Sequence, residues 1–221
     1  MLNKNEKRLE EVRFKTANIL KGLLSSQKLA LLALEACDSQ SFKDVGVPIK
    51  QITQRVEDID NLILKIFALY TPEAKDLREM VAFLKITSSL QRIATNEKNY
   101  IKNMEICNPK TDEELKRVIK ESLSINRCTI KAFEYTIEMI EETEDRDRIK
   151  ALSSKIAVEY SKTDDIYSMI EKDVLQIMHQ NHGVSEEYIN ILKYIRKNLK
   201  IVDRLEDIVT RLIFARIGGK L

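Results

Sequence analysis

The sequence predicts an all-α protein made of two tandem three-helix bundles with an internal repeat. Among its 221 residues only 5 are Gly and 3 are Pro, which is well below ordinary usage. Charged residues make up 33% and hydrophobic residues 43%, a balance typical of amphipathic helices rather than of a disordered chain. A β-sandwich or barrel would need many more turn residues. The few helix breakers divide the chain into six segments, each with helical periodicity.

The first two helices are predicted on either side of one turn. Apolar residues recur near the helical period from about Lys4 to Cys37, and Gly46-Val47-Pro48 marks the turn that follows. Pro48 is expected in the first turn of the second helix, where its missing N–H costs least. Gly22 alone lies inside a predicted helix, and the sequence offers no reason for it.

The third helix completes the first predicted bundle. Thr71-Pro72 is a favourable start, with Thr as N-cap and Pro at the first helical position. The helix is expected to run towards Met104, and Asn108-Pro109 then interrupts the chain. We therefore predict one bundle over residues 1–107 and a second over residues 108–221.

The second bundle is also predicted to contain three helices. Thr111 followed by Glu114 matches a capping box at the start of the fourth helix, which reaches about Glu142 before an acidic turn. The fifth helix is expected to end near His179, and Ser185 is a suitable cap for the sixth.

The two halves share a pattern at a fixed offset of 112 residues, which places Arg204 in the position of Arg92. Three apolar residues upstream follow the same offset: Leu77, Met80 and Leu90 correspond to Ile189, Leu192 and Val202. Shared periodicity together with one arginine favours an internal duplication.

Composition and motifs exclude several classes of function. The formal net charge is only +2, so the chain as a whole does not favour nucleic acid. No apolar run approaches the roughly 18 residues needed to span a bilayer, and the N-terminus lacks the apolar stretch of a signal peptide. Cys37, Cys107 and Cys128 follow no metal-binding spacing, which predicts reduced thiols in a cytoplasmic protein. Motifs for phosphate-binding loops and hydrolases are absent, so an enzyme is not expected.

The third helix carries a fairly specific motif. Residues 74–86 read Ala-Lys-Asp-Leu-Arg-Glu-Met-Val-Ala-Phe-Leu-Lys-Ile, and Leu90-Gln91-Arg92-Ile93 follows. This stretch resembles the third helix of the PhoU family, with Arg78, Arg92 and Asn99 at motif positions. The sixth helix resembles the family's second copy of the motif around Arg204.

The resemblance implies two three-helix bundles related by a pseudo-twofold, in a protein that is cytoplasmic and usually dimeric. It further implies a regulator that restrains phosphate uptake and signalling. Its partners would be the ATPase of the phosphate ABC transporter and the sensor histidine kinase. Two alternatives remain open, namely a PhoU-like accessory protein of another phosphate or metal-ion transporter, and a metal-binding helical protein.

Some members of the family bind a divalent or trivalent metal through acidic residues on the helices. Asp203 and Asp207 are spaced i, i+4 and therefore lie on one helical face, where oxygen ligands suit a hard or borderline cation. Asp165 and Asp60 lie near the family positions for the partner acids on the fifth and second helices. These four residues are the predicted metal ligands.

The first half lacks the corresponding acids, because Gln91 and Thr95 occupy their positions. Even in the second half, the competing interpretation is a charged surface in which Arg204 pairs with Asp207 at i+3. Arg92 and Arg204 are alternatively expected to tie adjacent helices together through hydrogen bonds.

Two further groups of residues have less specific interpretations. His179 and His182 lie at a predicted helix end, which indicates a solvated turn rather than a metal site. The last helix carries a basic face that suits either an acidic partner or anionic lipid headgroups, or is simply a solvated face. Its members are Lys193, Arg196, Lys197, Lys200, Arg204, Arg211, Arg216 and Lys220.

Overall fold

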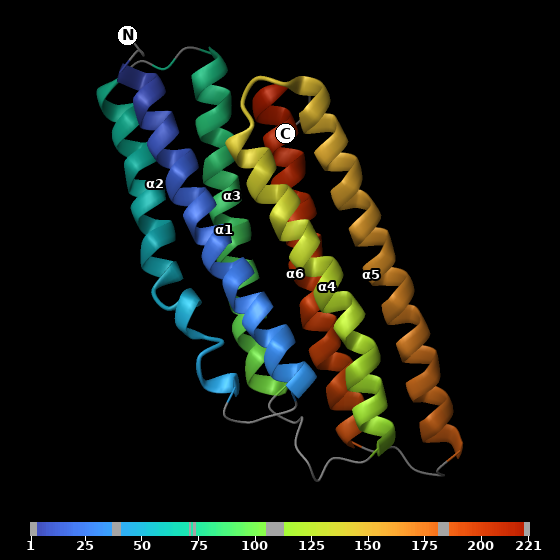
Figure 1. Cartoon of the computed structure of the whole chain (residues 1–221). Coiled ribbons are helices and arrows are strands. Elements are labelled where there is room, and N and C mark those ends of the chain that lie inside the picture. Colours follow the sequence, from blue (N-terminus) through green and yellow to red (C-terminus); the bar gives the residue numbers. More distant parts are fainter. Residues whose placement is uncertain are drawn as a thin grey trace.

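The computed structural model describes residues 4–36, 41–70, 72, 74–104, 113–180 and 186–218. In these residues the predicted all-α fold is confirmed. Six long helices appear in the predicted order, and two short 3₁₀ helices join the first two (Figure 1). The bounds are α1 Lys4–Ala36, η1 Ser41–Lys43, η2 Val47–Ile49, α2 Ile52–Leu69, α3 Ala74–Met104, α4 Glu113–Glu141, α5 Arg146–Gln180 and α6 Glu186–Arg216.

The helices lie side by side along one direction, with α1–α3 on one side of the molecule and α4–α6 on the other (Figure 1). The two halves meet where α3 packs along α6 and α1 packs along α4. Buried apolar side chains from all six helices form one continuous core, so the two bundles share a hydrophobic interior. The predicted boundary between residues 107 and 108 lies outside the described residues.

Pro48 is predicted to lie in the first turn of the second helix. It lies instead in the separate 3₁₀ helix η2. Lys50 then adopts an extended conformation, and Gln51 has a φ of 62° in the left-handed region. This reversal of the backbone ends η2 and starts α2 at Ile52, because a left-handed residue cannot continue a right-handed helix.

The structure also explains why Gly22 lies inside a helix. A Cβ atom at Gly22 would lie 3.0 Å from the main-chain oxygen of Pro48. The missing side chain therefore allows α1 to approach the η2 segment closely.

The other predicted caps are tested only in part. Pro72 lies before α3, which begins at Ala74, so it is not the first helical residue. Thr71, Thr111 and Ser185 lie outside the described residues.

A buried ion cluster joins the two halves near one end of the helices. The carboxylate of Glu79 on α3 accepts two hydrogen bonds from the guanidinium of Arg13 on α1, at 2.7 and 2.8 Å. It also accepts one from Arg216 on α6 at 2.5 Å, and both side chains of that pair are at most 3% exposed. Burial would raise the pKa of Glu79, but the two arginines outweigh burial and lower it. Glu79 is therefore an ionised carboxylate held between two cations.

We expect Glu79→Gln to lower the free energy of unfolding by about 3–5 kcal/mol, because it leaves two arginines without their buried counter-charge. Urea denaturation measures the loss. The matched control is Glu138→Gln, which removes an exposed carboxylate that Arg148 also binds twice and should cost about 1 kcal/mol or less. Equal losses in the two variants would show that the buried cluster does not hold the halves together.

A second buried network lies where α1, α3, α4 and α6 meet. The amide of Gln27 donates to Glu97 at 2.5 Å and to Asn198 at 3.1 Å. Asn126 donates to the Gln27 oxygen at 2.9 Å, and Thr129 donates to Asn198 at 3.1 Å. All five side chains are at most 1% exposed, so the network links both halves away from solvent.

Glu97 has no cationic partner in this network. Burial raises the pKa of its carboxyl from 4.5 to about 8, although hydrogen bonds with Gln27 and Ser26 act in the opposite direction. The carboxyl is therefore protonated in the folded protein at neutral pH, because an isolated charge is costly in such surroundings.

The raised pKa predicts that stability falls as the pH rises from about 4.5 to about 8. Across this interval the folded state holds a proton that the unfolded state has lost, at a cost of up to about 1.4 kcal/mol per pH unit. Above the folded-state pKa both states are ionised and the loss stops growing. Glu97→Gln should remove this component, so the variant should match the parent near pH 4 and exceed its stability near pH 9. A constant difference in unfolding free energy across these pH values would contradict the assignment.

Candidate functional site

The four predicted metal ligands lie on three helices. Asp60 is on α2, and one of its carboxylate oxygens is buried without a hydrogen-bond partner. Asp165 is exposed on α5, whereas Asp203 and Asp207 are half-buried on α6. Only the last two are brought close together.

The acid of α5 that acts on Asp203 is Asp164, the neighbour of the predicted Asp165. The pKa of Asp203 is raised, first by burial and then by the charges of Asp207 and Asp164, against the lowering effect of Arg204 and Lys200. The α5–α6 surface thus carries acids and bases together.

Within the described part of the chain, no three acidic, histidine or cysteine side chains come close enough to hold a metal ion. The residues present do not fit the predicted metal centre. Asp207 is instead bound to Arg204 at 2.5 Å, and the side chains of Arg204 and Asp207 are 34% and 40% exposed. The Arg204–Asp207 pair of the alternative interpretation is thus present in the structure.

The family-motif residues occupy separate places. Arg78 lies against the end of α6, where a Cβ on Gly218 would be 3.2 Å from its guanidinium. Asn99 contributes its main-chain oxygen, which accepts from Asn103. Arg204 bonds within α6, and no contact in the described structure ties Arg92 to a neighbouring helix. The expectation that Arg92 and Arg204 join helices through hydrogen bonds is therefore not supported.

The described thiol and histidine do not form a reactive site. Cys128 is buried, and burial followed by the nearby Glu159 raises its pKa to about 11, which disfavours the nucleophilic thiolate. His179 is exposed in the last turn of α5. Cys37, Cys107 and His182 lie outside the described residues.

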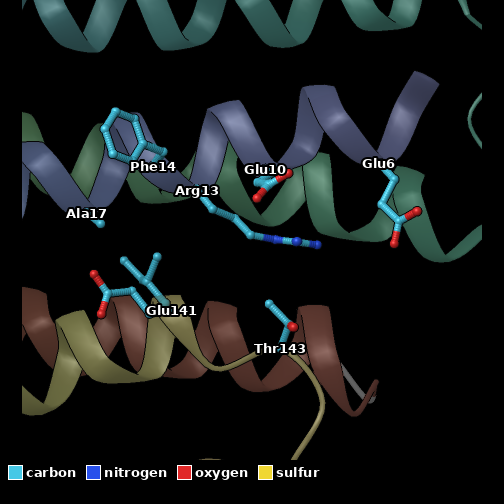
Figure 2. A pocket seen from close by; sticks show the side chains of 8 residues that line it. Glu6, Glu10, Arg13, Phe14, Ala17, Glu141 and Thr143 are labelled. Atoms are coloured by element: carbon cyan, nitrogen blue, oxygen red, sulfur yellow. The ribbon is translucent and has the colours of Figure 1, made fainter. Parts of the chain in front are cut away.

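A cleft of about 360 Å³ opens between the first half of α1 and the end of α4. Figure 2 shows its labelled side chains, with Arg13 extending from α1 towards the opposing helix end. The lining consists of Glu6, Glu10, Arg13, Phe14, Ala17, Ile140, Glu141 and Thr143.

Three acids and one arginine line this cleft, so its lining is net acidic. Burial lowers the pKa of Arg13, but Glu79, Glu10 and Glu6 outweigh burial and raise it. Glu141 is bonded to Lys21 at 2.7 Å. Phe14 lies in this acidic setting with 66% of its surface exposed.

An exposed aromatic ring with acids around it suits recognition of another molecule rather than catalysis. Sequence reasoning missed this cleft. Its one local signal was Phe14, a large apolar residue outside the buried stripe that contains Leu9 and Val12. The two helices that form the cleft are far apart in the sequence, so the cleft itself had no sequence signal.

No helix among the described residues combines the length and apolar character needed to cross a membrane.

Comparisons with known proteins agree with the motif. The family model described as the PhoU domain matches residues 17–104. A phosphate-specific transport system accessory protein PhoU homolog from Borreliella burgdorferi is 28% identical over 87% of this chain and 85% of its own length. A homolog of the same name from Zymomonas mobilis is 27% identical over 77% of this chain and 72% of its own. Residues 17–104 thus match a PhoU domain, and the chain is similar to PhoU homologs over most of its length.

Solved structures confirm the fold over both halves. PhoU from Pseudomonas aeruginosa has a TM-score of 0.81 at 20% identity, covering 96% of this chain and 99% of that one. The phosphate transport system regulatory protein PhoU from Streptococcus pneumoniae has a TM-score of 0.73 at 19% identity, with 99% of each chain covered. The family model matches only the first half, so these structures extend the likeness to the second.

If Asp207 belongs to a surface ion pair, Asp207→Ala should cost less than about 0.5 kcal/mol. Urea denaturation of the full chain measures this cost, and elemental analysis of untagged protein tests the predicted metal in the same preparation. A stoichiometric metal that is lost with Asp207→Ala would reinstate the metal site.

Proposed function

We propose that this protein regulates phosphate uptake and phosphate signalling by binding partner proteins through its helix faces, without catalysing a reaction. Its partners would be the ATPase of a phosphate ABC transporter, the sensor histidine kinase, or both. It would act as a homodimer in the cytoplasm.

The observation that carries this proposal is the length of the match to named relatives. The Borreliella burgdorferi protein, an accessory protein of a phosphate-specific transport system, aligns over 87% of this chain. The likeness thus extends well beyond a single motif, which supports a shared role. The buried Cys128 thiol and the family's regulatory character support a function without catalysis.

The docking surface we propose is the cleft between α1 and α4 (Figure 2). Its exposed Phe14 offers an apolar anchor, and Glu6, Glu10 and Glu141 form an acidic surround. Charge complementarity selects a partner segment that carries Lys or Arg beside an apolar side chain. Such a segment would cover Phe14 and place its cations beside the acids.

The buried ion cluster of Glu79, Arg13 and Arg216 lies below this cleft and supports the α1 surface. Arg13 lines the cleft and is held twice by Glu79, so the α1 surface is fixed to α3. Regulation then requires that the cleft bind one conformational state of the partner more tightly than the other, because only differential affinity shifts an equilibrium.

The experiment is a pulldown from phosphate-replete cells with the full chain as bait. The parent protein should recover a phosphate transporter component or a phosphate-sensing kinase. Phe14→Ser should reduce recovery at least tenfold, because loss of a central aromatic anchor typically costs on the order of 2 kcal/mol. The matched control is Met169→Ser on α5, since Met169 is 67% exposed and Phe14 is 66% exposed.

Recovery of neither partner class would count against the proposed function. Equal recovery by Phe14→Ser and Met169→Ser would keep the function and move the docking surface away from this cleft. Light scattering of the untagged chain tests the homodimer separately.

A further inference from the structure

A second groove lies between α3 and α6, where the two halves meet. It has a volume of about 400 Å³ and is open to solvent. Its lining is Gln91, Arg92, Thr95, Asn96, Lys200 and Arg204. The two arginines that correspond across the internal repeat, Arg92 and Arg204, therefore line one common groove.

The lining carries three cationic side chains and no acidic one. In the described part of the chain, neither Arg92 nor Lys200 forms an ion pair. Arg204 forms an ion pair with Asp207. Cations that face a common space repel one another, and an anion bound between them would relieve this repulsion.

The groove also presents hydrogen-bond donors. Each guanidinium carries five N–H groups in a planar fork and the ammonium of Lys200 carries three, while Gln91 and Asn96 contribute amide N–H groups. The hydroxyl of Thr95 donates to the main-chain oxygen of Gln91. Donors of this kind match an acceptor-only oxyanion, and arginine forks bind phosphate oxygens in pairs.

The internal repeat shows why α3 contributes no acid to this groove. At the offset of 112 residues, Gln91 corresponds to Asp203 and Thr95 corresponds to Asp207. Acids at these two places on α3 would neutralise the groove, as Asp207 does for Arg204. The neutral residues leave the cations of both helices available to a ligand.

We propose that this groove binds a phosphate group, held by Arg92, Lys200 and Arg204. The group belongs either to free inorganic phosphate or to the headgroup of an anionic phospholipid. This inference rests on the groove alone and is independent of the proposed docking of a partner protein at the α1–α4 cleft.

The first arm of the experiment titrates inorganic phosphate into the full chain by calorimetry, with chloride at equal ionic strength as the ionic control. Saturable binding to one site is expected. The double variant Arg92→Gln with Lys200→Gln should bind at least tenfold more weakly. The control double variant, Lys65→Gln with Arg146→Gln, removes the same charge from exposed positions on α2 and α5 and should bind as the parent does.

The second arm measures cosedimentation with phosphatidylglycerol vesicles and with phosphatidylcholine vesicles. Retention by phosphatidylglycerol alone, lost in the groove variant and kept in the control, identifies a lipid headgroup as the source. Saturable binding of inorganic phosphate with the same dependence on the variants identifies the free ion.

A third variant shows whether lost binding in the first variant comes from misfolding. Gln91→Glu with Thr95→Asp leaves every groove cation in place and restores the two acids, so it should also abolish binding. The proposal is overturned if the parent binds neither probe, if phosphate binds no better than chloride, or if the groove variant and the charge-matched control bind equally.

Discussion

The carboxylate of Glu79 is the constraint on which the arrangement of the helices depends. It lies on α3 in the first half, and its partners are Arg13 on α1 and Arg216 on α6. Arg216 also donates to the main-chain oxygen of Ile140 on α4 at 3.5 Å. A buried carboxylate is tolerated only while its cations remain in place. The contact therefore fixes four helices from both halves at one end of the molecule.

The second buried network constrains the same four helices farther along. Gln27, Glu97, Asn126 and Asn198 come from α1, α3, α4 and α6, one from each helix. Side chains of this kind must meet their partners, because an unpaired polar group is costly in the interior. Rotation or sliding of a central helix would break several of these bonds together. Neither network contains a residue of α2 or α5, which leaves the two outer helices attached mainly by apolar packing.

Both candidate binding surfaces follow from the way in which the halves are joined. The acidic cleft lies where α1 approaches the end of α4, and the basic groove lies where α3 approaches α6. Each surface thus takes residues from both halves and exists only when the halves are packed. The two surfaces carry opposite charge and therefore suit different ligands. The acids around Phe14 suit a cationic segment, whereas Arg92 and Lys200 suit an anion. Two surfaces built on one central frame suit a protein that acts by binding other molecules.

By itself, the sequence determined the six helices and the resemblance to PhoU proteins, because helical periodicity, breakers and the motif around Arg92 are local signals. It also indicated the pairing of Arg204 with Asp207, since i+3 neighbours meet on any helix. Only the tertiary structure decided which buried charges meet. Glu79 and Arg216 are 137 residues apart, and their contact depends on the rotation and register of two packed helices. The position of Pro48 was decided in the same way, because the turn that contains it packs against the bare backbone at Gly22. Local patterns carry no information on such distant contacts, and for this reason the acidic cleft, the basic groove and the protonated Glu97 became visible only in the folded chain.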